Sequence, residues 1–366
     1  MQAEQISDVP ETDTPLRVID IDPQTDRRWE SLVTKIPTSL IHHPAWLAVL
    51  EEAYGYRPAH LACEDMNGQI VGVLPLFERR GWRSGRSFTS LFACPLSYQN
   101  EASMALMQAA VKRAQAQRGV PLRLKAMSNA FDGRLDGMVG VPVYETFLLP
   151  LPERADLLRL DSSLKRAIKK ATKEGVQVRQ AENENELKAW YGLYLQTMHR
   201  LLVFPKPYRF FEVAWKRLRH RGMLRLLLAE HIEAGKRRLI AGFLLLQWGQ
   251  TVSYISAGWR HEDQALRPND ILHWQAIQDA CAGGFNCYDF GDVPLGNLGL
   301  ARYKSKWGAQ ANLVYDYSYP AARAETGSEH TQSERPGRRL STLVKQRLPG
   351  SAMGLLSNWF YALHLY

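Results

Sequence analysis

Apolar residues recur along the chain with two different spacings, and these spacings predict its helices and strands. Apolar positions three and four residues apart are typical of amphipathic helices, whereas alternating or short continuous apolar runs bounded by Gly, Asn or Asp indicate strands. Helices are expected at residues 37–54, 101–118, 161–175, 190–201, 208–220 and 268–282. Strands are expected at residues 61–63, 69–77, 87–92, 121–125, 224–230, 239–248, 251–257 and 285–290.

One strand pattern occurs twice. Residues 70–76 (IVGVLPL) and 240–246 (IAGFLLL) are apolar runs with glycine in the third place, and Gly72 and Gly242 lie 170 positions apart (242 − 72). In each half a helix and a closing strand follow, which indicates an internal duplication. An antiparallel meander joined to one crossover helix predicts a mixed α/β unit. The expected fold class is therefore α/β, with two such units in tandem, each a mostly antiparallel sheet flanked by helices.

The duplication sets the expected domain boundaries. We expect a first domain at residues 16–150 and a second, which carries the candidate site, at residues 151–318. Residues 1–15 are polar and are expected to be disordered. In this division residues 319–345 form a basic linker and residues 346–366 an apolar C-terminal helix.

The chain is basic, and its charge narrows the classes of partner. A net charge of +9 implies an anionic partner such as a phosphate, a nucleic acid, an acidic glycan or a membrane surface, although a basic surface also serves solubility alone. Residues 335–366 combine a basic run with an apolar, aromatic end. This segment leaves two interpretations open, a helix packed on the core or a peripheral contact with a membrane.

Cysteine usage and hydropathy suggest a cellular location. The four cysteines lack CxxC spacing, so we expect them to pack as small apolar residues, with neither a disulfide scaffold nor a metal site. No stretch reaches the roughly 18 apolar residues of a membrane span, and the N-terminus lacks the apolar core of a signal peptide. We therefore expect a cytoplasmic protein, with a place at the inner face of the membrane left open.

Residues 288–309 (YDFGDVPLGNLGLARYKSKWGA) contain the side chains best suited to chemistry. A strand ends in an acidic turn that holds Asp289 and Asp292, a glycine-containing loop follows, and cations then alternate with aromatic residues. Strand ends and glycine loops are where rigid scaffolds display reactive groups. A cation beside an aromatic wall can stabilise developing negative charge. The alternative is a surface hairpin whose lysines are merely solvated.

The order of elements in this stretch resembles a known family. Asp289-Phe290-Gly291, a short glycine loop, Tyr303-Lys304 and then Lys306-Trp307-Gly308-Ala309 are similar to the C-terminal signature of the FemAB-type acyltransferases. These tandem relatives of the GNAT acetyltransferases include peptidoglycan-bridge aminoacyltransferases and exopolysaccharide-associated enzymes. Asp292-Val293-Pro294 departs from the family pattern in the acidic turn, which leaves the acceptor open.

The resemblance implies a fold of two GNAT-like domains and roles for individual residues. Lys304 would stabilise the oxyanion or the leaving group, with Tyr303 as its matching aromatic neighbour. Asp289 or Asp292 could accept a proton from an amine or bind it as an ammonium ion, and the alternative for both is capping of the turn. The expected substrate-binding residues are Tyr303, Arg302, Lys306, Trp307, Arg166 and Lys169.

Residues 161–175 predict a basic amphipathic helix. Asp161 offers an N-cap and Gly175 a C-terminal stop. Lysines spaced four residues apart, such as Lys165 and Lys169, repel each other unless an anion binds between them. A solvated basic face is the usual outcome of such a charge run. The stretch also resembles the helix that opens the second FemAB domain, where basic groups approach substrate phosphate.

The acyl donor is partly constrained by a missing motif. GNAT enzymes that use acetyl-CoA carry (Gln/Arg)-x-x-Gly-x-(Gly/Ala) before the crossover helix, and backbone N–H groups there bind pyrophosphate. Residues 258–268 and 94–100 lack those glycines. Elimination therefore favours aminoacyl-tRNA or another activated acyl donor, with acyl-CoA as the alternative.

We therefore expect an N-acyltransferase that transfers an acyl or aminoacyl group to an amine on a cell-envelope (peptidoglycan) or exopolysaccharide precursor. Its partners would be an anionic small molecule or glycan precursor and, as donor, tRNA. One alternative is an acyl-CoA-dependent GNAT N-acetyltransferase. The other is a non-catalytic module that binds anions, nucleic acid or a membrane surface through its basic groups.

Overall fold

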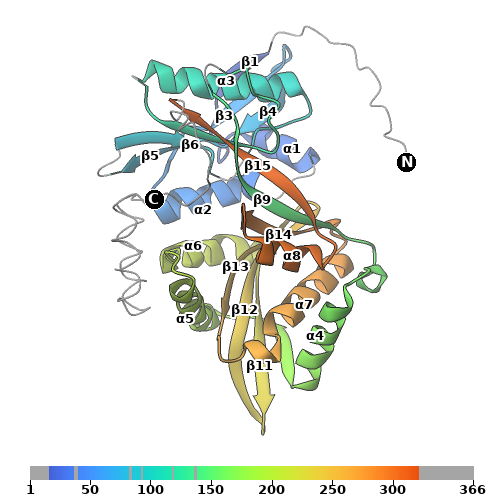
Figure 1. Cartoon of the computed structure of the whole chain (residues 1–366). Coiled ribbons are helices and arrows are strands. Elements are labelled where there is room, and N and C mark those ends of the chain that lie inside the picture. Colours follow the sequence, from blue (N-terminus) through green and yellow to red (C-terminus); the bar gives the residue numbers. More distant parts are fainter. Residues whose placement is uncertain are drawn as a thin grey trace, which may run out of the picture.

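The computed structural model describes residues 16–320 except 37–39, 82–84, 92–93, 118 and 136–137 (Figure 1). The expected disordered N-terminus, the C-terminal helix and nearly all of the basic linker lie outside the described residues. Predictions made for those segments therefore stay predictions.

The first half of the chain contains three helices and nine strands among its described residues. Their order matches the predicted meander, crossover helix and closing strand. The elements are β1 (Arg17–Asp20), α1 (Arg27–Lys35), α2 (Pro44–Tyr54), β2 (Arg57–Pro58), β3 (Leu61–Glu64), β4 (Ile70–Leu74), β5 (Phe77–Gly81), β6 (Gly85–Thr89), β7 (Leu96–Ser97), α3 (Asn100–Ala116), β8 (Leu122–Ala126) and β9 (Val141–Pro150).

The second half follows the same plan with longer strands. A short 3₁₀ turn, Ala155–Leu157, leads into it. The elements are α4 (Ser162–Lys173), β10 (Val176–Gln180), α5 (Glu184–Arg200), α6 (Tyr208–Leu218), β11 (Leu224–Glu233), β12 (Lys236–Trp248), β13 (Thr251–Trp259), α7 (Pro268–Ala282), β14 (Cys287–Pro294), α8 (Leu298–Ser305) and β15 (Gln310–Tyr319).

Capping residues in the sequence explain where helices α2 and α4 begin. Pro44 stands at the first turn of α2, where its missing N–H would have no intrahelical partner, and His43 Nδ1 accepts a hydrogen bond from Ala45 N at 3.0 Å. His43 is thus the N-cap of α2. Asp161 caps α4 in the same way, since its Oδ1 accepts from Ser163 N at 2.7 Å.

Eleven strands among the described residues form one sheet, and four form a smaller one. The large sheet has the order β10-β11-β12-β13-β14-β9-β15-β8-β6-β5-β2, and the small one β1-β3-β4-β7. Most neighbouring strands are antiparallel, but β6/β8 and β13/β14 are parallel. A helix joins the two strands of each parallel pair, α3 in the first half and α7 in the second. These matched arrangements confirm the mixed α/β class.

The two halves are joined through β9 and β15. The last strand of the second half, β15, pairs with β9 on one side and β8 on the other, and β9 also pairs with β14. Figure 1 shows both strands running between the upper and lower halves of the molecule. The proposed boundary at residue 150 therefore falls at the end of a strand that both halves share, and the division into two domains stays a prediction.

One apolar core also continues from one half into the other. Trp46 on α2 meets Phe210 on α6 edge to face, with ring centroids 5.8 Å apart. A second core lies between α7 and the β11–β14 strands, and a third between α3 and the first-half strands. No helix within the described part of the chain is both long enough and apolar enough to cross a membrane.

Candidate active site

The sheet opens where β13 and β14 diverge. These parallel strands pair over three residues, from Thr251↔Cys287 to Ser253↔Asp289. On its other side β14 has an irregularity against β9, because Asp289 and Asp292 are three residues apart while their partners, Leu148 and Thr146, are two apart. One extra residue in a ladder is a β-bulge, which leaves backbone groups that need other partners and often lies at functional sites.

Gly291 makes this bulge possible. Its φ is +72°, a conformation that disfavours a Cβ atom, and a Cβ added there would lie 3.1 Å from the carbonyl oxygen of Tyr254 on β13. Glycine at this position therefore lets the backbones of β13 and β14 approach where their regular pairing ends.

Lys304 hydrogen-bonds to the carbonyls that the bulge exposes. Its Nζ donates to the carbonyl oxygens of Gly291 at 2.8 Å and Asp292 at 3.1 Å, and lies 5.7 Å from the ring centroid of Phe147. The residue is 4% exposed. It belongs to helix α8, capped by Asn297, rather than to a hairpin. The alternative of a surface hairpin with solvated lysines is therefore wrong for Lys304.

Burial changes the proton affinity of Lys304. Desolvation lowers the pKa of its ammonium group to about 8, although the nearby Asp289 and Asp292 carboxylates act in the opposite direction. Two of its three N–H donors bind carbonyl oxygens, so one remains for another acceptor. A lysine with such a pKa is a cation at neutral pH, and it can release its proton at a pH only slightly above neutral.

Asp289 anchors the bulge. Its Oδ1 accepts hydrogen bonds from Gly291 N at 2.8 Å and from Thr146 Oγ1 at 3.2 Å. Desolvation raises the pKa of its carboxyl group, and these hydrogen bonds together with Lys304 oppose the rise. The structure thus places Asp289 in the turn-capping position that the sequence left open as an alternative.

Asp292 has a different environment. Asp292 is exposed to solvent. Even so, partial desolvation by the surrounding protein raises the pKa of its carboxyl group to about 6, and the negative charge of Asp289 adds to this rise. The charges of Lys304, Lys125 and Lys206 moderate this rise. An accessible carboxylate with a pKa near 6 is suited to accept a proton from a substrate at neutral pH.

Lys125 and Lys206 were missed by the sequence analysis. Lys125, on β8 of the first half, has its Nζ 3.4 Å from Asp316 Oδ2 and 5.4 Å from the ring centroid of Tyr144. Desolvation lowers its pKa. Because Tyr144 on β9 pairs with Pro294 on β14, two residues beyond Asp292, this first-half lysine lies near the bulge, although 179 positions (304 − 125) separate it from Lys304.

Lys206 lies on the segment between α5 and α6. Its Nζ is 3.5 Å from Ser256 Oγ on β13 and 5.5 Å from the ring centroid of Phe210. Burial lowers its pKa to about 8, while Asp292 favours its charged form. The flanking prolines in Pro205-Lys206-Pro207 were a usable signal, because they hold the lysine on a rigid connection.

A buried polar network supports α8 from behind. Tyr303 Oη donates to Asp270 Oδ1 at 3.1 Å, and His273 Nδ1 lies 3.0 Å from Tyr288 Oη. Desolvation raises the pKa of Asp270 and, together with the charge of Lys304, lowers that of His273 well below its usual value. His273 is therefore neutral, which avoids a second buried cation beside Lys304.

The remaining candidate residues are dispersed. Arg302 is exposed on α8, whereas Trp307 is 1% exposed and packs against Phe290 and Tyr303. The structure gives Trp307 a packing position rather than a substrate-facing one. Lys306 Nζ donates to Ser163 Oγ at 3.2 Å and so joins the end of α8 to the start of α4. Arg166 and Lys169 are exposed on α4, and Lys169 lines a hollow that does not include Lys304.

A family model agrees with the second half of this geometry. Residues 159–305, from just before α4 to the end of α8, match the model of the acetyltransferase (GNAT) domain. This part of the chain is thus a GNAT-type acyltransferase domain. No curated protein sequence matches the chain significantly.

Solved structures agree over most of the chain. FemX superposes with a TM-score of 0.67 at 16% identity, covering 83% of this chain and 97% of FemX. The C-terminal domain of a putative lysylphosphatidylglycerol synthetase from Agrobacterium fabrum gives 0.55 at 13% identity, covering 81% and 91%. L-PGS from Bacillus licheniformis gives 0.54 at 12% identity, covering 92% and 99%. The chain therefore has the FemAB-like fold, with a GNAT acyltransferase domain in its second half.

Proposed function

We propose that the chain is an N-acyltransferase that transfers an acyl or aminoacyl group to an amine on a cell-envelope or exopolysaccharide precursor. The observation that carries this proposal is the buried Lys304 ammonium, bound to the backbone carbonyl oxygen of Asp292 at the bulge in β14, beside the accessible side-chain carboxylate of that same residue. One group remains a cation at neutral pH, and the other titrates just below it. Acyl transfer to an amine needs both functions.

The chemistry follows from these two groups. The Asp292 carboxylate accepts a proton from the acceptor's ammonium group, and the neutral amine then attacks the carbonyl carbon of the donor. The oxygen that becomes negative is stabilised by the Lys304 cation, whose third N–H is not used by the bulge. As the carbon–leaving-group bond breaks, Lys304 can donate a proton to the departing thiolate or alkoxide, because the pKa of its ammonium group is about 8. The neutral lysine then takes up the proton that the attacking nitrogen loses as it becomes an amide.

Lys125 and Lys206 suit an anionic acceptor. Both are half-buried, on opposite halves of the chain, and both are electrostatically coupled to Asp292. Cations in a partly desolvated site bind phosphate or carboxylate groups more strongly than exposed lysines do. A precursor that carries its amine near a phosphate or carboxylate would therefore have its amine at Asp292 and its anion between these lysines.

The donor is either aminoacyl-tRNA or acyl-CoA. The matching family model is that of an acetyltransferase, which favours CoA, whereas the absence of glycines between β13 and α7 favours another donor. Titration calorimetry with CoA and acetyl-CoA separates the two. Measurable binding supports the acetyltransferase, and its absence leaves the tRNA-borne donor.

Mass spectrometry of envelope glycans and their precursors tests the proposal in cells. In cells that lack the chain, we expect one species to lose the mass of one amino acid or acyl unit, and the wild-type gene to restore it. A Lys304→Met gene, expressed at the same level, should not restore it. If the charge reversals Lys169→Glu and Lys170→Glu matter and Lys304→Met does not, the chain is a binding module instead.

A further inference from the structure

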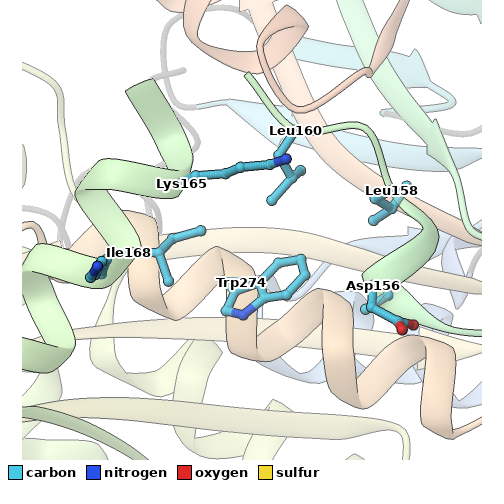
Figure 2. A pocket seen from close by; sticks show the side chains of 8 residues that line it. Asp156, Leu158, Leu160, Lys165, Ile168 and Trp274 are labelled. Atoms are coloured by element: carbon cyan, nitrogen blue, oxygen red, sulfur yellow. The ribbon is translucent and has the colours of Figure 1, made fainter. Parts of the chain in front are cut away.

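A hollow lies beside α4 and α7, away from Lys304. Its volume is about 320 Å³, within the range of small ligand pockets. Leu158, Leu160 and Ile168 form its apolar walls with the half-buried Trp274 of α7. Figure 2 shows the indole ring between Ile168 and Leu158, at the base of the hollow.

Two lysines stand at the rim of this hollow. Lys165 and Lys169 are one turn apart on α4, and in Figure 2 the Lys165 side chain extends from α4 along the rim toward Leu160. The acidic group that also lines the hollow, Asp156, pairs with Arg154 at 2.5 Å. No carboxylate among the described residues forms an ion pair with either lysine. The rim therefore carries net positive charge above an apolar floor.

The surface around the hollow also combines cations with exposed apolar side chains. Arg166, Lys170 and Lys173 are exposed on α4, and Leu157, adjacent to the hollow in sequence, is 63% exposed. Five cations on one short helix repel each other, so an anionic partner relieves an energetic cost that the fold otherwise carries. An apolar hollow with cations at its rim complements one kind of molecule, an apolar chain that ends in a phosphate.

We propose that this hollow binds an anionic phospholipid of a membrane surface, with the acyl chain against Trp274 and the phosphate between Lys165 and Lys169. Lysine stems can cover the chain while their ammonium groups reach the phosphate. The site would hold the α4 face of the molecule against the bilayer. Trp274 is one helical turn from Asp270, which contacts Tyr303, so membrane binding would bring the Lys304 helix close to lipid-linked acceptors.

Vesicle co-sedimentation of the full chain tests this proposal. The probes are phosphatidylcholine vesicles with and without phosphatidylglycerol, and we expect binding only with the anionic lipid. Lys165→Gln/Lys169→Gln should weaken the partition coefficient by on the order of thirtyfold. Arg166→Gln/Lys170→Gln removes the same charge at the same spacing on α4 but away from the hollow, and should weaken it only a few-fold. Equal losses in the two pairs would overturn the proposal.

The apolar floor is tested separately. Trp274→Ala, checked for folding by thermal melting, and Leu158→Gln should each reduce binding to the anionic vesicles by about tenfold relative to wild type. Leu158→Gln keeps the test decisive if the tryptophan variant does not fold. Binding that is unchanged in both the lysine-pair and the Leu158 variants places any membrane contact elsewhere, and overturns the proposal.

Two competitors identify other partners. Neither soluble glycerol phosphate nor tRNA should displace the protein from the anionic vesicles. Displacement by glycerol phosphate would assign the hollow to a soluble phosphate, and displacement by tRNA to a nucleic acid; either result contradicts the lipid. Because these measurements use no acyl donor, their failure leaves the proposed acyl transfer untouched.

Discussion

Lys304 Nζ donates a hydrogen bond to the carbonyl oxygen of Gly291 at 2.8 Å, and this contact joins α8 to the bulge in β14. Gly291 adopts its positive φ without strain because it has no Cβ atom, whereas Lys304 is desolvated by burial. The carbonyl oxygens that the bulge exposes accept hydrogen bonds from the desolvated ammonium group, so each group supplies the partner that the other needs. Such mutual support is typical of a site whose geometry is held rigidly for chemistry.

Replacing Lys304 by methionine should stop acyl transfer while the protein stays folded. The loss of a preorganised cation costs a factor of about 100 or more in kcat. Two partly buried carbonyl oxygens also lose their donor, which should lower the free energy of unfolding by about 1–3 kcal/mol. Urea unfolding and a transfer assay measure both. Normal turnover in a folded variant would show that Lys304 only supports the bulge.

Gly291→Ala should lower the free energy of unfolding more than Gly284→Ala does. Both glycines have nearly the same backbone conformation, with φ of +72° and +73°. An added Cβ at Gly284 meets nothing within 4 Å, whereas at Gly291 it meets Tyr254 O at 3.1 Å. The shared backbone cost is about 1–2 kcal/mol, so the difference between the two variants reports the close approach of β13 and β14. Equal losses would contradict this explanation of the bulge.

The pH dependence of kcat/KM should be bell-shaped. Asp292 must be ionised to accept a proton, so activity rises as pH increases through about 6, the pKa of its carboxyl group. Lys304 must be protonated, so activity falls as pH rises through about 8, the pKa of its ammonium group. Asp292→Asn should lower activity and remove the acidic limb. An unchanged acidic limb in that variant would assign it to another group.

Lys206→Met should move the acidic limb of the profile to higher pH. The positive charge of Lys206 lowers the pKa of Asp292, so its removal lets that pKa rise further. Lys188→Met, at an exposed lysine on α5, is the matched control and should leave the limb in place. KM for an anionic acceptor should also increase in the Lys206 variant alone. A limb that stays fixed would separate Lys206 from the site.

The elements whose signals are local could be predicted from the sequence. The expected helix at 268–282 has the bounds of α7, because Pro268 starts it and Gly283 follows its end. Asp161 and Gly175 likewise bounded α4. The strands of the meander were found because their apolar runs are bounded by turn residues.

Other features depend on contacts between distant parts of the chain. Gly296 and Gly299 suggested a loop, yet α8 begins at Leu298 because Asn297 caps it and the helix packs on β14. The strand β15 lies between β8 and β9 in the sheet, and no pattern in the residues of these three strands indicates that pairing. Lys125 reaches the site only through the folded sheet, so periodicity and spacing could not select it. The prolines beside Lys206 marked a rigid connection, but they did not show where that connection lies in the fold.

The most direct test is the intact mass of an amine acceptor after incubation with the protein and a donor. Envelope precursors extracted from cells that lack the chain serve as acceptor, and acyl-CoA or aminoacyl-tRNA as donor. We predict that the wild-type protein adds the mass of one acyl or aminoacyl unit with one of these donors, and that folded Lys304→Met adds none. The same mass gain with both proteins, or no gain with either donor, would contradict catalysis at Lys304.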